Sequence, residues 1–540
     1  MNKRWLWRRA AGGLLLAAAL PLGAQTLFPI HLRTPRVEPI RGLDARIRGG
    51  KLHLTLNAFL KLVLANDTQI QLLRLDDDNA RNAVLAAHSP FDPELQASFS
   101  SSRSVQPQIS QTSGASTLSQ LGQDTSLNYS QALPSGQEVQ INFGSNRFSS
   151  NSSFATFNPS IGADVSFSFT QPLLRNRGGL QNFTGLLVAR TQLVAVGDTT
   201  AWQIADQLVS AADQYWATVQ ARDAIEVQQE ALNLARRSYQ RDQRALRLGA
   251  LAPGDIFTSQ AQVAQDQTAL LQAQSNYRQQ LDLLRRLIGA DLDPAAQAAT
   301  IVLDDDPGAT PPEAPLLTVD QAVAAALRRR PEMDALRRQA LEDEFTLNAA
   351  RDGLRPQLNL TGSYGSNGLA GDQVPIVTPL GTQIGGSATG FGSALGQVFG
   401  FGSPTYGFTL SLNLPLRNSG GEASLANALV AQTSAAYQER NERQAITQQV
   451  RLADTQLRMA VAVVKSATTA QKLAQENVAA EQQKYQLGSI TVFELLQAQV
   501  QLSNARLTLL GAYTGYQEAR IAYERAIWTL LDTLQLRVNP

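Results

Sequence analysis

Side chains that commonly carry enzyme chemistry are scarce in this sequence. The 540-residue chain has no cysteine and three histidines, His31, His53 and His88. The absence of cysteine excludes disulfides, thiolate metal sites and cysteine nucleophiles. Three scattered histidines leave little material for a histidine metal site or a Ser-His-Asp triad. A formal net charge of +1 gives no electrostatic basis for nucleic-acid binding. We therefore expect no enzyme, no metal, no cofactor and no nucleic-acid partner.

Two acidic residues at equivalent positions are the clearest candidates for a polar site. Asp255 follows Gly249 by six residues, and Glu494 follows Gly488 by six. Both acids open a predicted helix, where the helix dipole stabilises a carboxylate by about 0.3–1 kcal/mol. That structural interpretation stands beside a functional one, in which gathered carboxylates attract cations. The glycine-rich stretch 390–402 does not open a helix after a strand, so we do not expect it to bind phosphate.

The acids belong to a pattern that the chain carries twice. Leu54 and Leu317 begin similar segments 263 residues apart, and Pro93 and Pro356 have the same spacing. The glycines and acids named above are 239 residues apart in both pairs. A match over about 40 residues without gaps indicates a repeat. We therefore predict two tandem repeats.

The ends of the repeats follow from composition. Basic residues precede a short apolar core over 10–20, too short to span a bilayer, and this pattern is typical of a secretory signal peptide. Prolines and aspartates crowd the middle of the chain and indicate a linker. The predicted segments are a signal peptide (1–24), an N-terminal linker (25–50), repeat 1 (51–290), a linker (291–316) and repeat 2 (317–537).

Each repeat is predicted to begin with a helix, followed by strands over 94–170 in the first repeat and 356–415 in the second. In these segments apolar residues alternate with serine, threonine and asparagine. Such alternation is typical of transmembrane barrel strands, and equally of a soluble antiparallel sheet with one apolar face.

Long proline-free segments then predict helical hairpins over 181–289 and 421–537. The 68 residues from Gln181 to Leu248 would span about 100 Å as a helix, far beyond a globular helix. Val450, Leu457 and Val464 recur every seven residues, with an alanine three positions after each, as in a coiled coil. A Leu-Gly pair at the end of each long helix is typical of a C-cap. An ordinary coiled coil without a channel is the alternative.

One copy has too few strands to close a barrel, and open strand edges are not stable in lipid. Membrane-spanning strands would therefore require several copies around one axis. Helices that continue from those strands would then form a tube.

With its two repeats, its Leu-Gly tips and its Gln171-Pro172-Leu173 and Leu414-Pro415-Leu416 strand exits, the chain resembles the TolC-like outer membrane efflux family over about residues 50–537. The resemblance implies an all-α coiled-coil helical barrel plus a transmembrane β-barrel completed by trimerisation. It implies a homotrimer with twelve strands in outer-membrane lipid and a periplasmic tunnel. It also implies docking to a periplasmic adaptor and an inner-membrane pump, so that the chain is a passive duct for efflux or type I secretion.

The resemblance also implies roles for single residues. Asp255 and Glu494 match carboxylates that form a cation-selective ring at a pore constriction. Tyr485 matches a gate tyrosine. The family's gate arginine falls at Ile490, so we expect a more apolar lock there. The residues that match adaptor-docking tips are Leu248, Gly249, Ala250, Leu487, Gly488 and Ser489; a plain helix C-cap is the alternative.

The sequence leaves two alternatives, one for the strands and one for the function. The Asp124–Phe148 hairpin is extra relative to the family, so a trimer would have eighteen strands, or the hairpin lies outside the barrel wall. The competing function is a soluble periplasmic coiled-coil scaffold.

Overall fold

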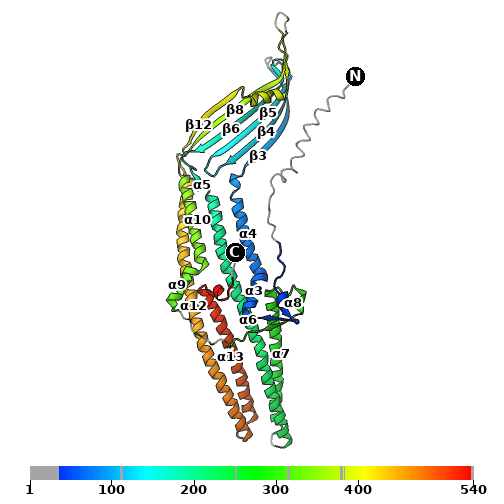
Figure 1. Ribbon diagram of the computed structural model, residues 1–540, viewed down its shortest axis with the longest axis vertical. Coiled ribbons are helices and arrows are strands. Elements are labelled where there is room, and N and C mark those ends of the chain that lie inside the picture. The colour runs from blue at the N-terminus through cyan, green and yellow to red at the C-terminus, as the bar shows by residue number, and fades with distance from the viewer. Residues whose placement is uncertain are drawn as a thin grey trace, which may run out of the picture.

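The computed structural model describes residues 36–109, 114–249, 252–309, 311, 313, 315, 317–377, 381 and 383–536. The molecule is elongated, with a sheet at one end, two helical hairpins at the other, and a small mixed region between them (Figure 1). Among these residues, no helix is both long and apolar enough to cross a membrane. The predicted signal peptide, His31 and Ala250 lie outside the described residues.

The sheet is antiparallel along its six long strands, counted over the described ranges. They follow the order β3-β4-β5-β6-β8-β12. Their bounds are β3 Glu94–Pro107, β4 Thr117–Ala132, β5 Glu138–Ser150, β6 Phe157–Pro172, β8 Gln357–Gln373 and β12 Pro404–Asn413. The hairpin β4–β5 lies inside this sheet, with β3 on one side and β6 on the other. The strands of both repeats therefore form one continuous sheet.

The register gives this sheet one apolar face and one polar face. Leu127 lies opposite Phe143, and Phe143 lies opposite Val165. The next residues along these strands, on the other face, are Asn128, Asn142 and Ser166, which are also directly opposite one another. Since side chains alternate along a strand, the serine- and asparagine-rich pattern produces these two faces directly. The outer strands β3 and β12 are exposed along their whole lengths.

Two hairpins of long helices form the rest of the length. The first pairs α6 (Thr184–Arg247) with α7 (Asp255–Leu287), and the second pairs α12 (Ser419–Gln486) with α13 (Val492–Ala526). The returning helices have 33 and 35 residues against 64 and 68 for the outgoing ones. The shorter returning helices do not extend to the sheet. Between the mixed region and the sheet, α4 (Thr68–Ala86) packs on α6, and α10 (Pro331–Gly353) packs between α6 and α12.

The heptad residues of the second repeat form the packing seam of α12. Val450, Leu457 and Val464 are buried in one cluster with Tyr516 of α13. Alanines at the layers between them permit a close approach of the two helices. The coiled-coil pattern therefore marks the contact between the arms of the hairpin.

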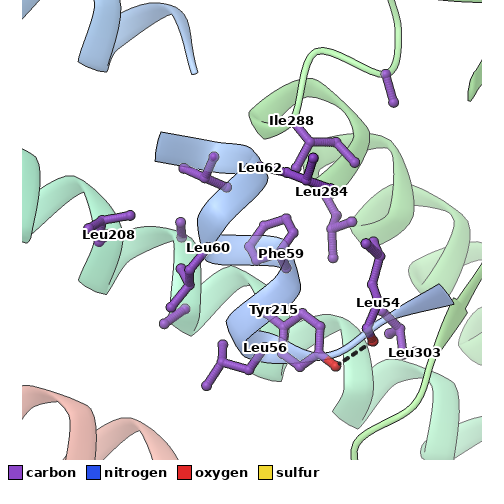
Figure 2. Packing of buried hydrophobic residues seen from close by; sticks show 14 of the residues in the cluster. Leu54, Leu56, Phe59, Leu60, Leu62, Leu208, Tyr215, Leu284, Ile288 and Leu303 are labelled. Carbon is purple, nitrogen blue, oxygen red and sulfur yellow. Dashed lines mark hydrogen bonds between the residues drawn. The ribbon is translucent and has the colours of Figure 1, made fainter. Parts of the chain in front are cut away.

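The mixed region between sheet and hairpins contains the largest hydrophobic core. Phe59 of α3 (Leu56–Asn66) packs on Tyr215 of α6, with ring centroids 5.5 Å apart (Figure 2). The Tyr215 hydroxyl donates to the backbone oxygen of Leu54 at 3.0 Å and to Asp305 Oδ2 at 2.8 Å. Burial of Tyr215, together with the charge of Asp305, raises the pKa of this hydroxyl, so it remains a donor.

Both predicted linkers contribute to this core, which corrects their interpretation as plain connections. Residues 291–316 include α8 (Pro294–Ala298) and β7 (Thr300–Leu303), and β7 pairs in parallel with β2 (Lys51–Leu54). Residues 25–50 include η1 (Asp44–Arg46) and β1 (Ile47–Arg48), which pairs with β2. The apolar side chains of Leu43, Ile301 and Leu303 are buried, and this burial holds both segments in place.

A buried arginine joins α10 to α12 at the level of the mixed region. Arg330, 1% exposed, donates through Nη1 to Gln449 Oε1 at 2.8 Å and through Nε to Glu332 Oε1 at 3.0 Å. Arg525 of α13 lies 3.8 Å from the same carboxylate.

The remaining elements are η2 Ser89–Phe91, α5 Gly179–Asn182, α9 Val319–Arg329, β9 Ile376–Val377, β10 Gln383–Ile384, β11 Ala388–Thr389, α11 Phe391–Phe399 and α14 Leu530–Thr533.

The helix α11 corrects the expectation for stretch 390–402, which does contain a helix. Its apolar residues pack against the sheet. The pattern was hidden because five glycines lie among the same thirteen residues and dominate their composition.

Candidate functional site

The turns of both hairpins lie at the end of the molecule furthest from the sheet (Figure 1). Gly249 and Gly488 each have φ of +71°, a conformation that glycine adopts without a Cβ penalty. After α12, the amide of Ser489 donates to the Lys484 oxygen and the amide of Gly488 to the Tyr485 oxygen, both at 3.0 Å. These two bonds form a Schellman motif, so the Leu-Gly signal does end the helix.

The tips also expose large apolar side chains. Leu248 and Leu487 occupy equivalent positions of the two repeats, and both are 82% exposed. Phe257 and Phe493, in the first turns of the returning helices, are exposed as well. Exposed apolar groups of this size at equivalent positions are typical of a contact surface for another protein.

A buried carboxylate next to the tips connects the two hairpins. Asp242 of α6 is completely buried and accepts hydrogen bonds from Ser259 of α7 and, at 3.1 Å, from the hydroxyl of Tyr485 of α12. Arg241 donates to the same carboxylate at 3.0 Å, and its guanidinium lies over the Tyr485 ring, 4.2 Å from the centroid. Asp242 is thus paired and hydrogen-bonded, as a buried charge must be.

Tyr485 is the predicted gate residue that takes part in this contact. Burial, and then the negative charge of Asp242, raise the pKa of its hydroxyl. The hydroxyl therefore stays protonated and donates to Asp242 at neutral pH. The contact is polar, although the sequence comparison with the family led us to expect a more apolar lock at Ile490. Ile490 is half-buried beside the buried Val492.

Sequence reasoning missed Asp242, although a signal for it exists. The 239-residue offset that pairs the tips also pairs Asp242 with Glu481, an acid in the same place of the second repeat. Glu481 is bonded to Lys484 at 2.8 Å. A search for acids conserved between the two repeats would have found this pair.

The two predicted ring carboxylates are exposed in the first turns of their helices. Glu494 closes a capping box: its Oε2 accepts from the Thr491 amide at 2.8 Å, and its own amide donates to Thr491 Oγ1 at 3.4 Å. Asp255 is the first residue of α7. Within the described part of a single chain, no hydrogen bond or ion pair joins the two acids. Glu494 thus has a structural role whether or not it also faces a pore.

Further up, α6 and α13 meet along a polar seam between the hairpins. Thr514 donates to Gln220 Oε1 at 3.2 Å, and Arg525 Nε lies 2.6 Å from Asp206 Oδ1. Between these pairs, Glu518 interacts with Asp213, and burial, followed by the charge of Asp213, raises the pKa of Glu518 to about 7. The carboxylates of Glu518 and Asp213 therefore repel each other when both are ionised.

Comparison with known proteins finds a family that is similar to part of this chain. A family model described as outer membrane efflux protein matches residues 322–527. This segment of the chain, within the second predicted repeat, is therefore similar to the outer membrane efflux protein family. No curated protein matches the chain.

Solved structures show the same fold over nearly the whole chain. A membrane protein from Pseudomonas aeruginosa has 17% identity and a TM-score of 0.63, covering 92% of this chain and 99% of its own. The CmeC outer membrane channel of Campylobacter jejuni has 14% identity and a TM-score of 0.61, covering 93% and 94%. The open state of the MtrE outer membrane channel of Neisseria gonorrhoeae has 16% identity and a TM-score of 0.58, covering 88% and 89%.

Family and fold agree with each other. The matched family is one of outer membrane efflux proteins, and the similar CmeC and MtrE structures are outer membrane channels. Together they support an outer membrane efflux channel.

Proposed function

We propose that three copies of this chain form one outer-membrane duct that passively exports cargo. The observation that carries the proposal is the sheet, which is apolar on one face and ends in two exposed strands, β3 and β12. A strand edge in hydrocarbon leaves backbone groups without hydrogen bonds, at several kcal/mol each. Pairing β12 of one copy with β3 of the next removes both edges and closes the sheet into a barrel.

The number of strands in this barrel would differ from the twelve that the family resemblance implies. Each chain contributes six long strands within its described residues, because β4–β5 belongs to the sheet. Three copies would supply eighteen. The polar face, rich in serine and asparagine, would then line a water-filled lumen, and the apolar face would contact lipid.

Below the barrel, we propose that the helices of the three copies form a periplasmic tunnel. Cargo would come from an inner-membrane pump through a periplasmic adaptor, with no energy supplied by the duct. The exposed Leu248 and Leu487 at the tips support an adaptor-docking role for residues 248–250 and 487–489.

The contact of Asp242 with Tyr485 supports a gate at the same end, with Ile490 beside it. It connects two hairpins that must separate if the tube is to widen. We further propose that Asp255 and Glu494 of three copies form a ring of six carboxylates at the constriction, which favours cations. Asp255→Asn combined with Glu494→Gln should lower cation selectivity in planar bilayers. Glutamine can still accept from the Thr491 amide, so the capping box is retained; unchanged selectivity would exclude both acids from the pore.

A direct test uses the absence of cysteine from the chain. Cysteine pairs placed one at a time on β3 and β12 should form disulfides between copies, giving a covalent trimer on a denaturing gel. The untreated protein should need detergent for extraction and should conduct ions in a bilayer. A water-soluble monomer without conductance would instead support a periplasmic coiled-coil scaffold.

A further inference from the structure

A short helix lies on the apolar face of the sheet. Ala394 and Val398 of α11 are completely buried against Ala163 of β6 and Ala370 of β8. The contact is close because β8 has a glycine beneath the helix: a Cβ on Gly368 would lie 2.1 Å from the Ala394 backbone oxygen. Small residues on two neighbouring strands thus form a shallow seat that α11 fills.

The same helix satisfies the backbone of β8 beyond the start of β12. β12 begins at Pro404, opposite Ser366, so it provides no partner for Leu369, which lies three residues further along β8. The Gln397 side chain accepts from the Leu369 amide and donates to the Leu369 oxygen, both at 3.0 Å. One side-chain amide therefore replaces a missing strand residue on the edge of β8.

The outer side of α11 is apolar. Its sequence, FGSALGQVF, contains no charged residue. Phe391 and Phe399 are exposed, Phe399 by 63%. Just after the helix, Phe401 is also exposed, and its ring lies 5.9 Å from that of Tyr364 on the same face of the sheet. In water this group would expose a large apolar surface on one nine-residue helix, which is unfavourable.

Two arginines, Arg103 and Arg147, lie on the same face of the sheet, near the level of this helix. Arg147 of β5 lies opposite Ile161 of β6, and Ile161 packs against α11. Arg103 of β3 shares the face of Phe99 and is nearer the end of its strand. Exposed arginines at the rim of an apolar band are typical of the headgroup level of a membrane.

We propose that α11 is a lipid-facing part of the barrel wall, where it replaces the upper part of β12 and contacts hydrocarbon near the headgroups. This inference rests on the proposed function, because it takes the apolar face of the sheet as the lipid face. Its occupant is lipid, since the exposed side of α11 continues the surface that Tyr364 and Phe408 expose.

The test places a single environment-sensitive fluorophore on the full-length protein in vesicles that contain brominated phosphatidylcholine, a quencher within the bilayer. The chain has no native cysteine, so Phe399→Cys, Phe408→Cys and Thr409→Cys each give one labelled site. Phe408 and Thr409 are neighbours on opposite faces of β12. We expect labels at 399 and 408 to be quenched at least twofold more than the label at 409.

The controls separate this inference from the proposed function. Quenching at 408 but not at 399 would overturn the role of α11 alone. A label at 399 shielded from both brominated lipid and an aqueous quencher would show that a second copy covers the helix, and would also overturn it. Absence of quenching at 408 would overturn the lipid face itself, and the inference with it.

A second variant tests the seat of the helix. Gly368→Ala should displace α11 and reduce quenching at 399 by at least twofold. Gly362→Ala is the matched control, because it lies on the same strand and face with nothing within 4 Å of the added Cβ. Equal quenching in the two variants, both assembling like the parent, would contradict the close packing of α11 on Gly368.

Discussion

Replacing Tyr485 with phenylalanine removes one hydrogen bond that joins the two hairpins of a chain near their tips. The hydroxyl donates to the buried carboxylate of Asp242 at 3.1 Å. The ring remains, and with it the packing of Arg241 over its face. Asp242 also keeps its bonds from Arg241 and Ser259. The substitution therefore changes one contact and leaves the carboxylate paired.

The size of the effect follows from that contact. A hydrogen bond to a charged group contributes about 1.5–3 kcal/mol when buried. Tyr485 is only half-buried, so we take about 1 kcal/mol per chain. If the closed state keeps the bond in all three copies and the open state in none, the loss is about 3 kcal/mol. This corresponds to a shift of about 100-fold toward the open state.

Single-channel recording in planar bilayers measures this shift as open probability. Tyr239→Phe is the matched control, since Tyr239 lies on α6 one turn from Asp242 and has no hydrogen bond through its hydroxyl within the described residues. We expect Tyr485→Phe to raise open probability strongly and Tyr239→Phe to leave it unchanged. Equal open probabilities in both variants would show that the bond does not hold the gate. Lower open probability in Tyr485→Phe would reverse its assigned role.

Three other predictions concern separate parts of the chain. Arg330→Met removes the ion pair with the partly buried Glu332 carboxylate, whose remaining cation, Arg525, lies 3.8 Å away. It should lower the free energy of unfolding by about 3 kcal/mol in denaturant titration, the lower end of the range for a broken buried pair. Arg337→Met, from an exposed pair, should change the free energy of unfolding by less than about 1 kcal/mol. Burial and the charge of Asp213 raise the folded-state pKa of Glu518 to about 7. Between about pH 4.5 and 7 the folded state therefore binds more protons than the unfolded state, so the free energy of unfolding should fall as pH rises through this window. Denaturant titrations at several pH values should show a flatter slope for Glu518→Gln. Gly249→Glu places a bulky charged residue at φ +71° on a tip and should abolish efflux while trimers still form; loss of trimers as well would mean that the glycine acts only as a helix cap.

Local patterns in the sequence identified most elements near the site. Period-two alternation marks the strands, because an antiparallel sheet with unlike faces requires it. The valine and leucine heptad marks the buried seam of α12, and the Leu-Gly pairs mark tips where only glycine adopts φ of +71° at low cost. Each of these signals lies within a few residues of the feature that it predicts.

Features that depend on distant partners were not visible in the same way. The β7 strand reads as part of a proline-rich linker until β2, some 250 residues earlier, is placed beside it. The nine residues of α11 read as loop because the small-residue seat that holds the helix comes from two other strands. Asp242 reads as one of many helical acids until Ser259 and Tyr485 converge on it.

The sequence by itself determined the duplicated plan, the two faces of the strands and the positions of the hairpin turns, since each is set by residue spacing along one segment. Only the tertiary structure decided that the β4–β5 hairpin belongs to the sheet, that a polar contact joins the hairpins, and that α11 covers the edge of β8. Those three outcomes depend on which hydrogen-bonding groups and apolar surfaces meet across the chain, and spacing within one segment does not specify such meetings.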